Sequence, residues 1–256
     1  MKNNYLFFIL IIITIIIILS IGIYYYNLDS FNNDYNSITF LSKEQTQAFI
    51  KEDADDYIKN LSIYDLRARN VKSNDEYLKL VIDSCMDFNE EQKQKLMICA
   101  NEAKKFYDNK INWTFAFVNN NYEQGYPHTR GAVIFISNNT INSNNGELTK
   151  TLIHESVHIY QRYNKNEIKQ YLIENNYYIS RKRDKNSLVR SNPDLDEYIY
   201  KDKNGVEMIA NYTNENPKGI NDISLKNLMF EHPFEKMAYE MGEEYSKSQL
   251  MKYRDI

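Results

Sequence analysis

The pentapeptide His-Glu-Ser-Val-His at residues 154–158 decides how this chain is interpreted, because it has the form H-E-x-x-H. Apolar residues recur at helical spacing around it, and the run Glu147–Tyr163 is predicted to be one helix that begins near Asn144 or Asn145. Residues i and i+4 lie on one face of a helix, so that two imidazoles four residues apart can reach one ion. The sequence therefore predicts a helix that carries two metal ligands.

The chemistry of a catalytic zinc ion explains the three polar positions of the motif. Such an ion takes three protein ligands and keeps the fourth position for water, whose pKa it lowers. His154 and His158 are predicted to be two of the ligands of a Zn²⁺ cofactor. Glu155 is predicted to be the general base that takes a proton from this water and delivers it to the leaving amine. The expected reaction is hydrolysis of peptide bonds in a polypeptide substrate.

The third ligand is expected from a later helix that begins near Pro233, since proline suits the first turn of a helix. Glu235 is the predicted ligand. Ala238 and Gly242 share its stripe at helical spacing, and their small side chains would let this helix approach the zinc helix closely. The alternatives left open for the third ligand are His232, Glu240 and His128.

These two segments together resemble the gluzincin branch of the zincin metallopeptidases. The resemblance covers roughly residues 113–245, with H-E-x-x-H as its first motif and E-x-x-A at Glu235–Ala238 as its second. It implies that the strand Ala132–Ser137 lines the cleft and pairs with an extended substrate. Many gluzincins have a carboxylate four residues after the glutamate ligand that orients a histidine, and this chain has Tyr239 there.

A peptidase also needs a hydrogen-bond donor for the oxyanion that forms during the reaction. The residue types that can donate such a bond include tyrosine, histidine and arginine. The candidates considered from the sequence are Tyr200, Tyr212, His128 and Arg130, and the pattern does not rank them.

The N-terminal segment 5–26 holds no charged residue and is long enough to span a bilayer, which takes about 20 apolar residues. Its length and its poor cleavage site favour an uncleaved anchor over a signal peptide. Lys2 precedes the segment, and Asp29 and Asp34 follow it. We therefore expect a single-pass membrane protein with a cytoplasmic N-terminus and its C-terminal domain on the non-cytosolic side. The lipid bilayer is its expected partner through this segment.

The expected fold class is α+β, a zincin-like domain behind one transmembrane helix. The expected parts are a tail (1–4), the membrane helix (5–26), a polar linker (27–41) and the zincin-like domain (42–256). Within the domain we expect a helical layer (42–110), then a small sheet and the active-site helix (111–165), then a hairpin insert and the third-ligand helix (166–256). The elements expected in these parts are helices at Asp75–Met86 and Asn89–Tyr107, strands at Trp113–Val118 and Ala132–Ser137, and a hairpin around Asn204-Gly205.

The net charge and the two cysteines lead to two further expectations, one about partners and one about a disulfide. The net charge is −4, and the dense basic cluster at residues 181–185 is typical of a solvated loop, so that no nucleic-acid partner is expected. Cys85 and Cys99 would lie about 10 Å apart along neighbouring helices, which argues against a disulfide.

Two rival functions belong to other classes. One is a non-catalytic binding or assembly protein at a membrane, and it would have no use for a general base at Glu155. The other is a structural membrane protein in which H-E-x-x-H arose by chance, and it would bind no stoichiometric metal.

Overall fold

The structure is a computed structural model that describes residues 38–226 and 228–252. The chain divides into two units, residues 1–37 and 38–256, and the second contains all the described elements. The expected tail, the expected membrane helix at 5–26 and most of the expected linker therefore lie outside the described residues. The localisation that follows from them stays a prediction.

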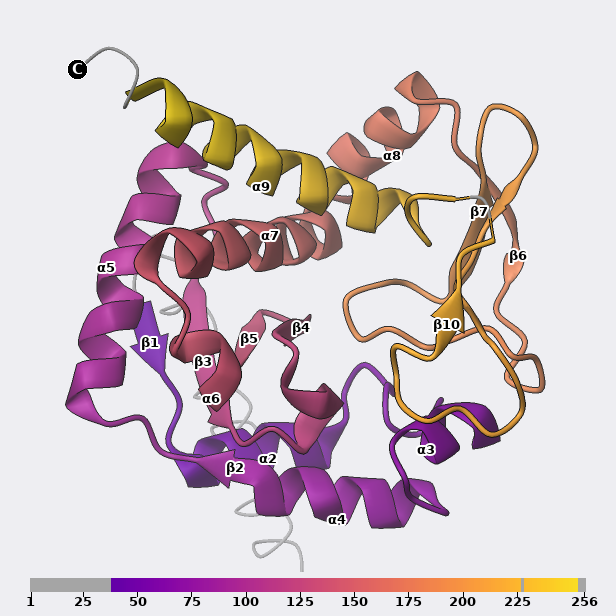
Figure 1. Cartoon of the computed structure of the whole chain (residues 1–256), viewed down its shortest axis with the longest axis horizontal. Helices are drawn as coiled ribbons and strands as arrows, with labels where there is room; N and C mark the ends of the chain where they lie inside the picture. The colour runs from indigo at the N-terminus through magenta and orange to yellow at the C-terminus, as the bar shows by residue number, and fades with distance from the viewer. Residues whose placement is uncertain (1–37, 227, 253–256) are drawn as a thin grey trace, which may run out of the picture. The chain divides into compact units, whose positions relative to one another are not determined.

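The central sheet mixes parallel and antiparallel strands (Figure 1). Strands β1 (Ile38–Phe40), β3 (Trp113–Val118), β5 (Val133–Ser137) and β4 (His128–Arg130) follow one another in that order. The pairs β1–β3 and β3–β5 are parallel, whereas β4 runs antiparallel to β5. The short strand β2 (Cys85–Met86) pairs antiparallel with the end of β3.

The central strands are apolar along their whole length because the sheet is buried on both faces. Successive side chains of a strand point to opposite faces. Trp113, Phe115 and Phe117 of β3 accordingly belong to one hydrophobic cluster, and Ala116 and Val118 belong to another on the opposite face. The two-sided burial explains why the period-2 alternation of a half-exposed strand is missing here.

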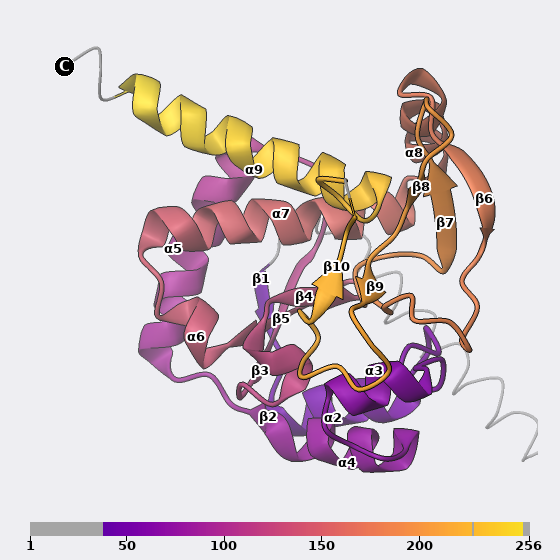
Figure 2. The same cartoon turned by 45° about the vertical axis from the view of Figure 1, so that its right-hand side comes forward.

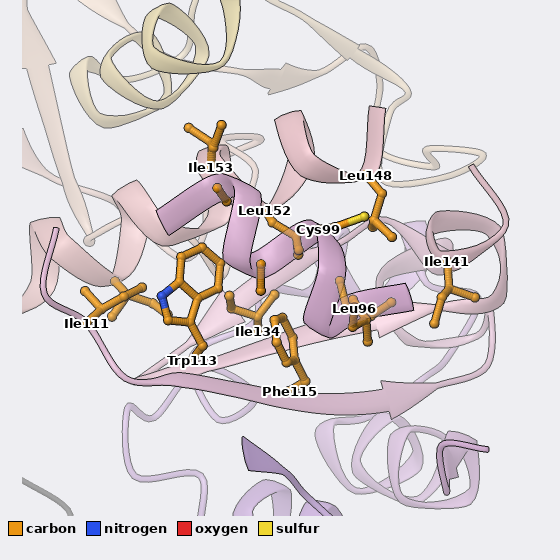
Figure 3. Packing of buried hydrophobic residues seen from close by; sticks show 14 of the residues in the cluster. Leu96, Cys99, Ile111, Trp113, Phe115, Ile134, Ile141, Leu148, Leu152 and Ile153 are labelled. Atoms are coloured by element: carbon orange, nitrogen blue, oxygen red, sulfur yellow. The ribbon is translucent and has the colours of Figure 1, made fainter. Parts of the chain in front are cut away.

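Helices cover the sheet on both faces. On one face α5 (Glu90–Phe106), α7 (Asn145–Tyr163) and α9 (Pro233–Lys252) share a core with β3 and β5. Figure 3 shows Trp113 and Leu152 together in this layer. On the other face lie α2 (Lys43–Glu52) and α4 (Asn74–Ser84). In both Figure 1 and Figure 2, α9 runs along the side of α7 that faces away from the sheet.

The remaining elements form the connections and a peripheral sheet. Strands β6, β7 and β8 pair antiparallel, and Gly205 turns between the last two with a φ of +77°, which confirms the predicted Asn-Gly hairpin. The other elements are α3 (Ile63–Ala68), η1 (Tyr122–Gly125), α6 (Asn138–Ile141), α8 (Lys165–Glu174), β6 (Tyr178–Lys182), β7 (Tyr198–Lys201), β8 (Glu207–Met208), β9 (Asn211–Tyr212) and β10 (Ile223–Ser224).

The expected fold class, α+β behind a membrane helix, is wrong for the described residues. They form a mixed α/β structure with several sheets, and no helix within 38–226 and 228–252 is long and apolar enough to cross a membrane. The strand β1, which lies in the expected linker, pairs parallel with β3. Parallel neighbours need a crossover, and the chain from α2 to α5 supplies it between β1 and β3.

Individual element boundaries follow the expectation closely except at one point. The helix predicted at Asp75–Met86 ends at Ser84, because Cys85 and Met86 pair with β3. The helix predicted at Asn89–Tyr107 is confirmed as α5, with the Asn89 side chain accepting a hydrogen bond from the backbone of Gln92.

Candidate metal centre

The helix α7 presents His154 and His158 on the side that faces α9. Its N-terminus is capped by Asn144, whose Oδ1 accepts a hydrogen bond from the backbone of Glu147 at 3.0 Å. Leu148 and Leu152 of the same helix are fully buried in the core against the sheet. Because this apolar stripe holds the helix to the sheet, its rotation leaves the two histidines on the opposite side.

The helix α9 begins beside them. His232 precedes its first residue, Pro233, and its Nδ1 accepts a hydrogen bond from the backbone of Phe234 at 3.1 Å. Gly242 lies so close to α7 that a Cβ atom there would meet the Lys150 side chain at 3.3 Å, and Ala238 is fully buried. The small residues therefore permit the close helix contact that the sequence predicted.

The imidazoles of His154 and His158 and the carboxylate of Glu235 meet between the two helices. The Nε2 atoms of the histidines lie 3.1 Å apart, and Glu235 Oε2 lies 3.4 Å from His154 Nε2 and 3.9 Å from His158 Nε2. Ligand atoms at ~2.0–2.1 Å from a tetrahedral zinc ion are about 3.3 Å from one another. Two of the three spacings are close to this value and the third is longer, so the cluster could hold a metal ion, and its donor types are ones that zinc accepts.

The protonation states of two of these groups suit a metal. Burial lowers the pKa of His158 to about 3, which keeps the imidazole neutral. Burial raises the pKa of Glu235, but the neighbouring His154 and His158 outweigh it and hold that pKa below its ordinary range. A neutral imidazole and an ionised carboxylate are the forms that bind a divalent cation.

Glu155 lies in the wall of the cavity next to the ligands. It is 2% exposed, and its Oε2 atom finds no hydrogen-bond partner among the described residues. Burial raises the pKa of Glu155 well above its ordinary range, and the charge of Asp194 adds to the effect. A buried carboxylate without a partner is costly, so it points to a ligand that the protein is built to receive.

The alternative third ligands lie outside this group. His232 has both ring nitrogens engaged, since Nε2 faces Asp196 Oδ1 at 3.3 Å. Glu240 pairs with Lys236 at 2.6 Å on the exposed side of α9. His128, on the edge strand β4, is not part of the ligand cluster.

The oxyanion donors considered from the sequence are mostly engaged elsewhere. Tyr200 donates to Asp196 Oδ2 at 2.9 Å, and Tyr212 donates to Asp65 Oδ1 at 3.0 Å. Arg130 is buried in ion pairs with Asp53 and Asp55.

His128 lines the cavity in a form that accepts hydrogen bonds at its free nitrogen. Its Nδ1 lies 3.0 Å from the carbonyl oxygen of Tyr126, which can only accept, so Nδ1 carries the proton. Burial lowers the pKa of His128, and the neutral ring therefore presents a lone pair at Nε2. It is an acceptor and so does not supply the missing donor.

The strand that was expected to pair with substrate has no free edge. β5 pairs with β3 along its whole length and with β4 over Val133–Phe135, so β4 is the edge strand of the sheet there. At Thr129 of β4, the backbone N donates to Asp194 Oδ1 at 2.6 Å and the backbone O accepts from Arg162 Nη2 at 3.0 Å. The expected substrate pairing at Ala132–Ser137 is therefore wrong, and even the edge strand is closed by side chains at Thr129.

Two of the proposed ligands, His154 and Glu235, open onto a cavity of about 1340 Å³, while His158 is fully buried behind them. The cavity is lined by His154, Glu155, Glu235 and Tyr239. The phenol of Tyr239 therefore lies in the same cavity as the predicted base, although the sequence analysis noted this residue only as a departure from the gluzincin pattern. The sequence could have indicated this role, because Tyr239 is four residues after Glu235 and residues i and i+4 share a helix face.

No known family model, curated protein or solved structure matches the chain. The chemistry of the site is therefore inferred from its own geometry.

Proposed function

We propose that this chain is a zinc-dependent peptidase that hydrolyses peptide bonds with metal-activated water. The proposal rests on one observation: the ligand atoms of His154, His158 and Glu235 converge beside the buried, unpartnered carboxylate of Glu155. It agrees with the ligand set that the resemblance to gluzincins implied. Two imidazoles and one carboxylate are a donor set typical of catalytic zinc, which leaves one position open.

A bound zinc ion supplies a Lewis acid and lowers the pKa of a water molecule to about 7. The protein residues do the rest. Glu155, one residue after His154 on α7, would take up a proton at Oε2 and return it to the nitrogen of the departing amine. Its burial excludes bulk water from the proton transfer.

Tyr239 is the group we assign to oxyanion stabilisation. It lies one turn after Glu235 on α9, it lines the cavity, and half of its surface is exposed. Its ring packs against His154, so that its position is tied to the metal centre. A phenol O–H donates one hydrogen bond, which is what a developing oxyanion requires.

The test compares Glu155→Gln with the wild-type protein. We expect both to bind one zinc ion per chain in elemental analysis, because Glu155 is not a ligand. We expect wild type to cleave an unfolded protein such as casein and Glu155→Gln to be inactive, because an amide does not accept the proton.

Other outcomes would decide against the proposal. Cleavage by purified Glu155→Gln would remove the general base from the mechanism. Stoichiometric zinc without cleavage of any peptide in a diverse library would favour a non-catalytic binding protein. Absence of zinc from the folded wild-type protein would mean that the motif arose by chance.

A further inference from the structure

Two amide side chains contact the proposed metal ligands directly, and the sequence pattern singled out neither. The Nδ2 atom of Asn192 donates to Glu235 Oε1 at 2.9 Å. The Oε1 atom of Gln161 lies 3.0 Å from Nδ1 of His158. The two contacts reach ligands that come from different helices.

The hydrogen bonds of Asn192 determine how Glu235 is oriented. The Asn192 Oδ1 accepts from the backbone N of Asp194 at 3.0 Å, so its amino group must face the other way. That amino group donates to Glu231 Oε1 at 3.0 Å as well as to Glu235 Oε1. With Oε1 of Glu235 occupied, Oε2 is the oxygen left to face the histidines.

Asn192 is itself held in place by contacts that do not involve the proposed ligands. The backbone N of the preceding residue, Ser191, donates to the fully buried Asp65 at 2.9 Å. Arg190, one residue earlier, forms an ion pair with Glu231. The two residues before Asn192 are therefore fixed by these contacts, and orienting Glu235 requires little further ordering of the chain.

The hydrogen bonds of Gln161 determine the state of His158 in the same way. Its Nε2 donates to the backbone carbonyl of Phe234 at 3.0 Å, which assigns the amide oxygen to the side facing His158. Nδ1 of His158 must then carry the proton, and the lone pair of Nε2 points toward the ligand cluster. Phe234 directly precedes Glu235, so the buried Gln161 also ties α7 to the start of α9.

We infer that Asn192 and Gln161 are positioning residues of the metal centre, one for each of the two ligands that they contact. Asn192 selects the oxygen of Glu235 that binds the metal, and Gln161 sets the tautomer and ring orientation of His158. This assignment rests on the proposed metal site. Partners of this kind typically contribute 10- to 100-fold to metal affinity.

The experiment measures zinc affinity by competition with a chromophoric chelator for wild type, Asn192→Leu and Gln161→Leu. Leucine has the branched shape of asparagine and one heavy atom fewer than glutamine, and it removes the hydrogen bonds of either amide. Asn109→Leu is the matched control, because Asn109 is a buried amide that donates to α7 at the carbonyl of Ser156, 3.0 Å away, and touches no ligand. The visible absorption of the Co²⁺-substituted proteins reports the ligand geometry in each variant.

We expect zinc affinity to fall roughly 10- to 100-fold in Asn192→Leu and in Gln161→Leu, with an altered Co²⁺ spectrum. The control should lose stability while its zinc affinity and spectrum stay those of wild type. Equal affinity in all four proteins would overturn the assignment, and so would an equal loss in the control. If wild type binds no zinc, the metal centre and this assignment both fail. Tight zinc binding without peptide cleavage would reject only the peptidase.

Discussion

The ring of Tyr239 packs edge-on against the ring of His154, with centroids 5.3 Å apart and planes at 88°. The contact joins a group that lines the cavity to a proposed metal ligand on the other helix. Phe230 packs on the tyrosine as well, with ring centroids 5.5 Å apart. Tyr239 thus has a defined position beside the centre while its surface remains half exposed to the cavity.

The substitution Tyr239→Phe removes the hydroxyl and keeps the ring contact. We expect kcat to fall by about 10²-fold, because one oxyanion donor is lost, while KM and zinc content change little. Steady-state kinetics and elemental analysis measure these effects. Tyr163→Phe, at the exposed end of α7, is the control and should behave as wild type. An unchanged kcat in Tyr239→Phe would remove the tyrosine from the mechanism.

If the proposed metal is bound, its removal should lower thermal stability, because the ion would join side chains from α7 and α9 in the folded state alone. A ligand present at a thousandfold excess over its Kd adds about 4 kcal/mol to the free energy of unfolding. We expect a chelator to lower the Tm of wild type by several degrees. Glu235→Gln, which lacks the carboxylate ligand, should show a much smaller shift. A Tm of wild type that does not respond to chelator and zinc would speak against the site.

Stability should depend on pH through Glu123, which lies in the cavity wall away from the ligands. Its carboxylate pairs with Arg69 at 2.6 Å, with both side chains buried, and accepts hydrogen bonds from Tyr57 and Tyr77. Burial raises the pKa of Glu123, but Arg69 outweighs it, so that the pKa lies below the ordinary 4.5. The stabilisation is therefore complete above about pH 4.5 and is lost as the pH falls through the lower folded value.

Urea unfolding across pH checks this ion pair. At pH 7 we expect Glu123→Gln to lose about 3 to 5 kcal/mol, since the buried Arg69 loses its close counter-charge and keeps only Asp65, 4.0 Å away. Below pH 4.5 the difference from wild type should shrink, because wild type protonates the same group. Asp83→Asn, which breaks the exposed Lys79–Asp83 pair, is the control and should change stability by less than about 1 kcal/mol.

The two cysteines should stay reduced and unreactive in the native protein. Both thiols are free and buried, although Cys85 lies in β2 and not in the helix that was expected to carry it. Burial raises the pKa of Cys85 to about 11 and also raises the pKa of Cys99, so few thiolates form at neutral pH. We expect iodoacetamide to label neither residue at pH 7.5 and both in urea, as read by mass spectrometry. A mass two units below the reduced value, or rapid native labelling, would contradict this.

Much of the local structure was predictable, because it depends on short-range patterns. The i, i+4 spacing of His154 and His158 on a helix follows from the helical period, and α7 has that period over its whole length. The strand Trp113–Val118 and the Asn-Gly hairpin were predictable from β propensity and turn chemistry in the same way. Even the place of Glu235 beside the histidines could be predicted, since small residues on its stripe indicated a close helix contact.

The errors fall where distant segments pair. β1 was missed because three residues after a polar stretch have no periodicity of their own, and their partner β3 lies far along the chain. The substrate strand was assigned wrongly because the sequence does not tell which of two strands lies at the sheet edge. Which segments pair depends on the packing free energy of many side chains together, and no single sequence motif reveals that sum.

The sequence by itself determined the types of ligand, their helical spacing and the base between them, because backbone geometry imposes that arrangement locally. The tertiary structure decided which carboxylate joins the histidines, and which amides hold that carboxylate and His158. Asn192 reaches Glu235 because Asp65 and Arg190 anchor its loop, and Gln161 reaches His158 and Phe234 because α9 packs on α7. Such contacts depend on the positions of segments that only the complete core brings together.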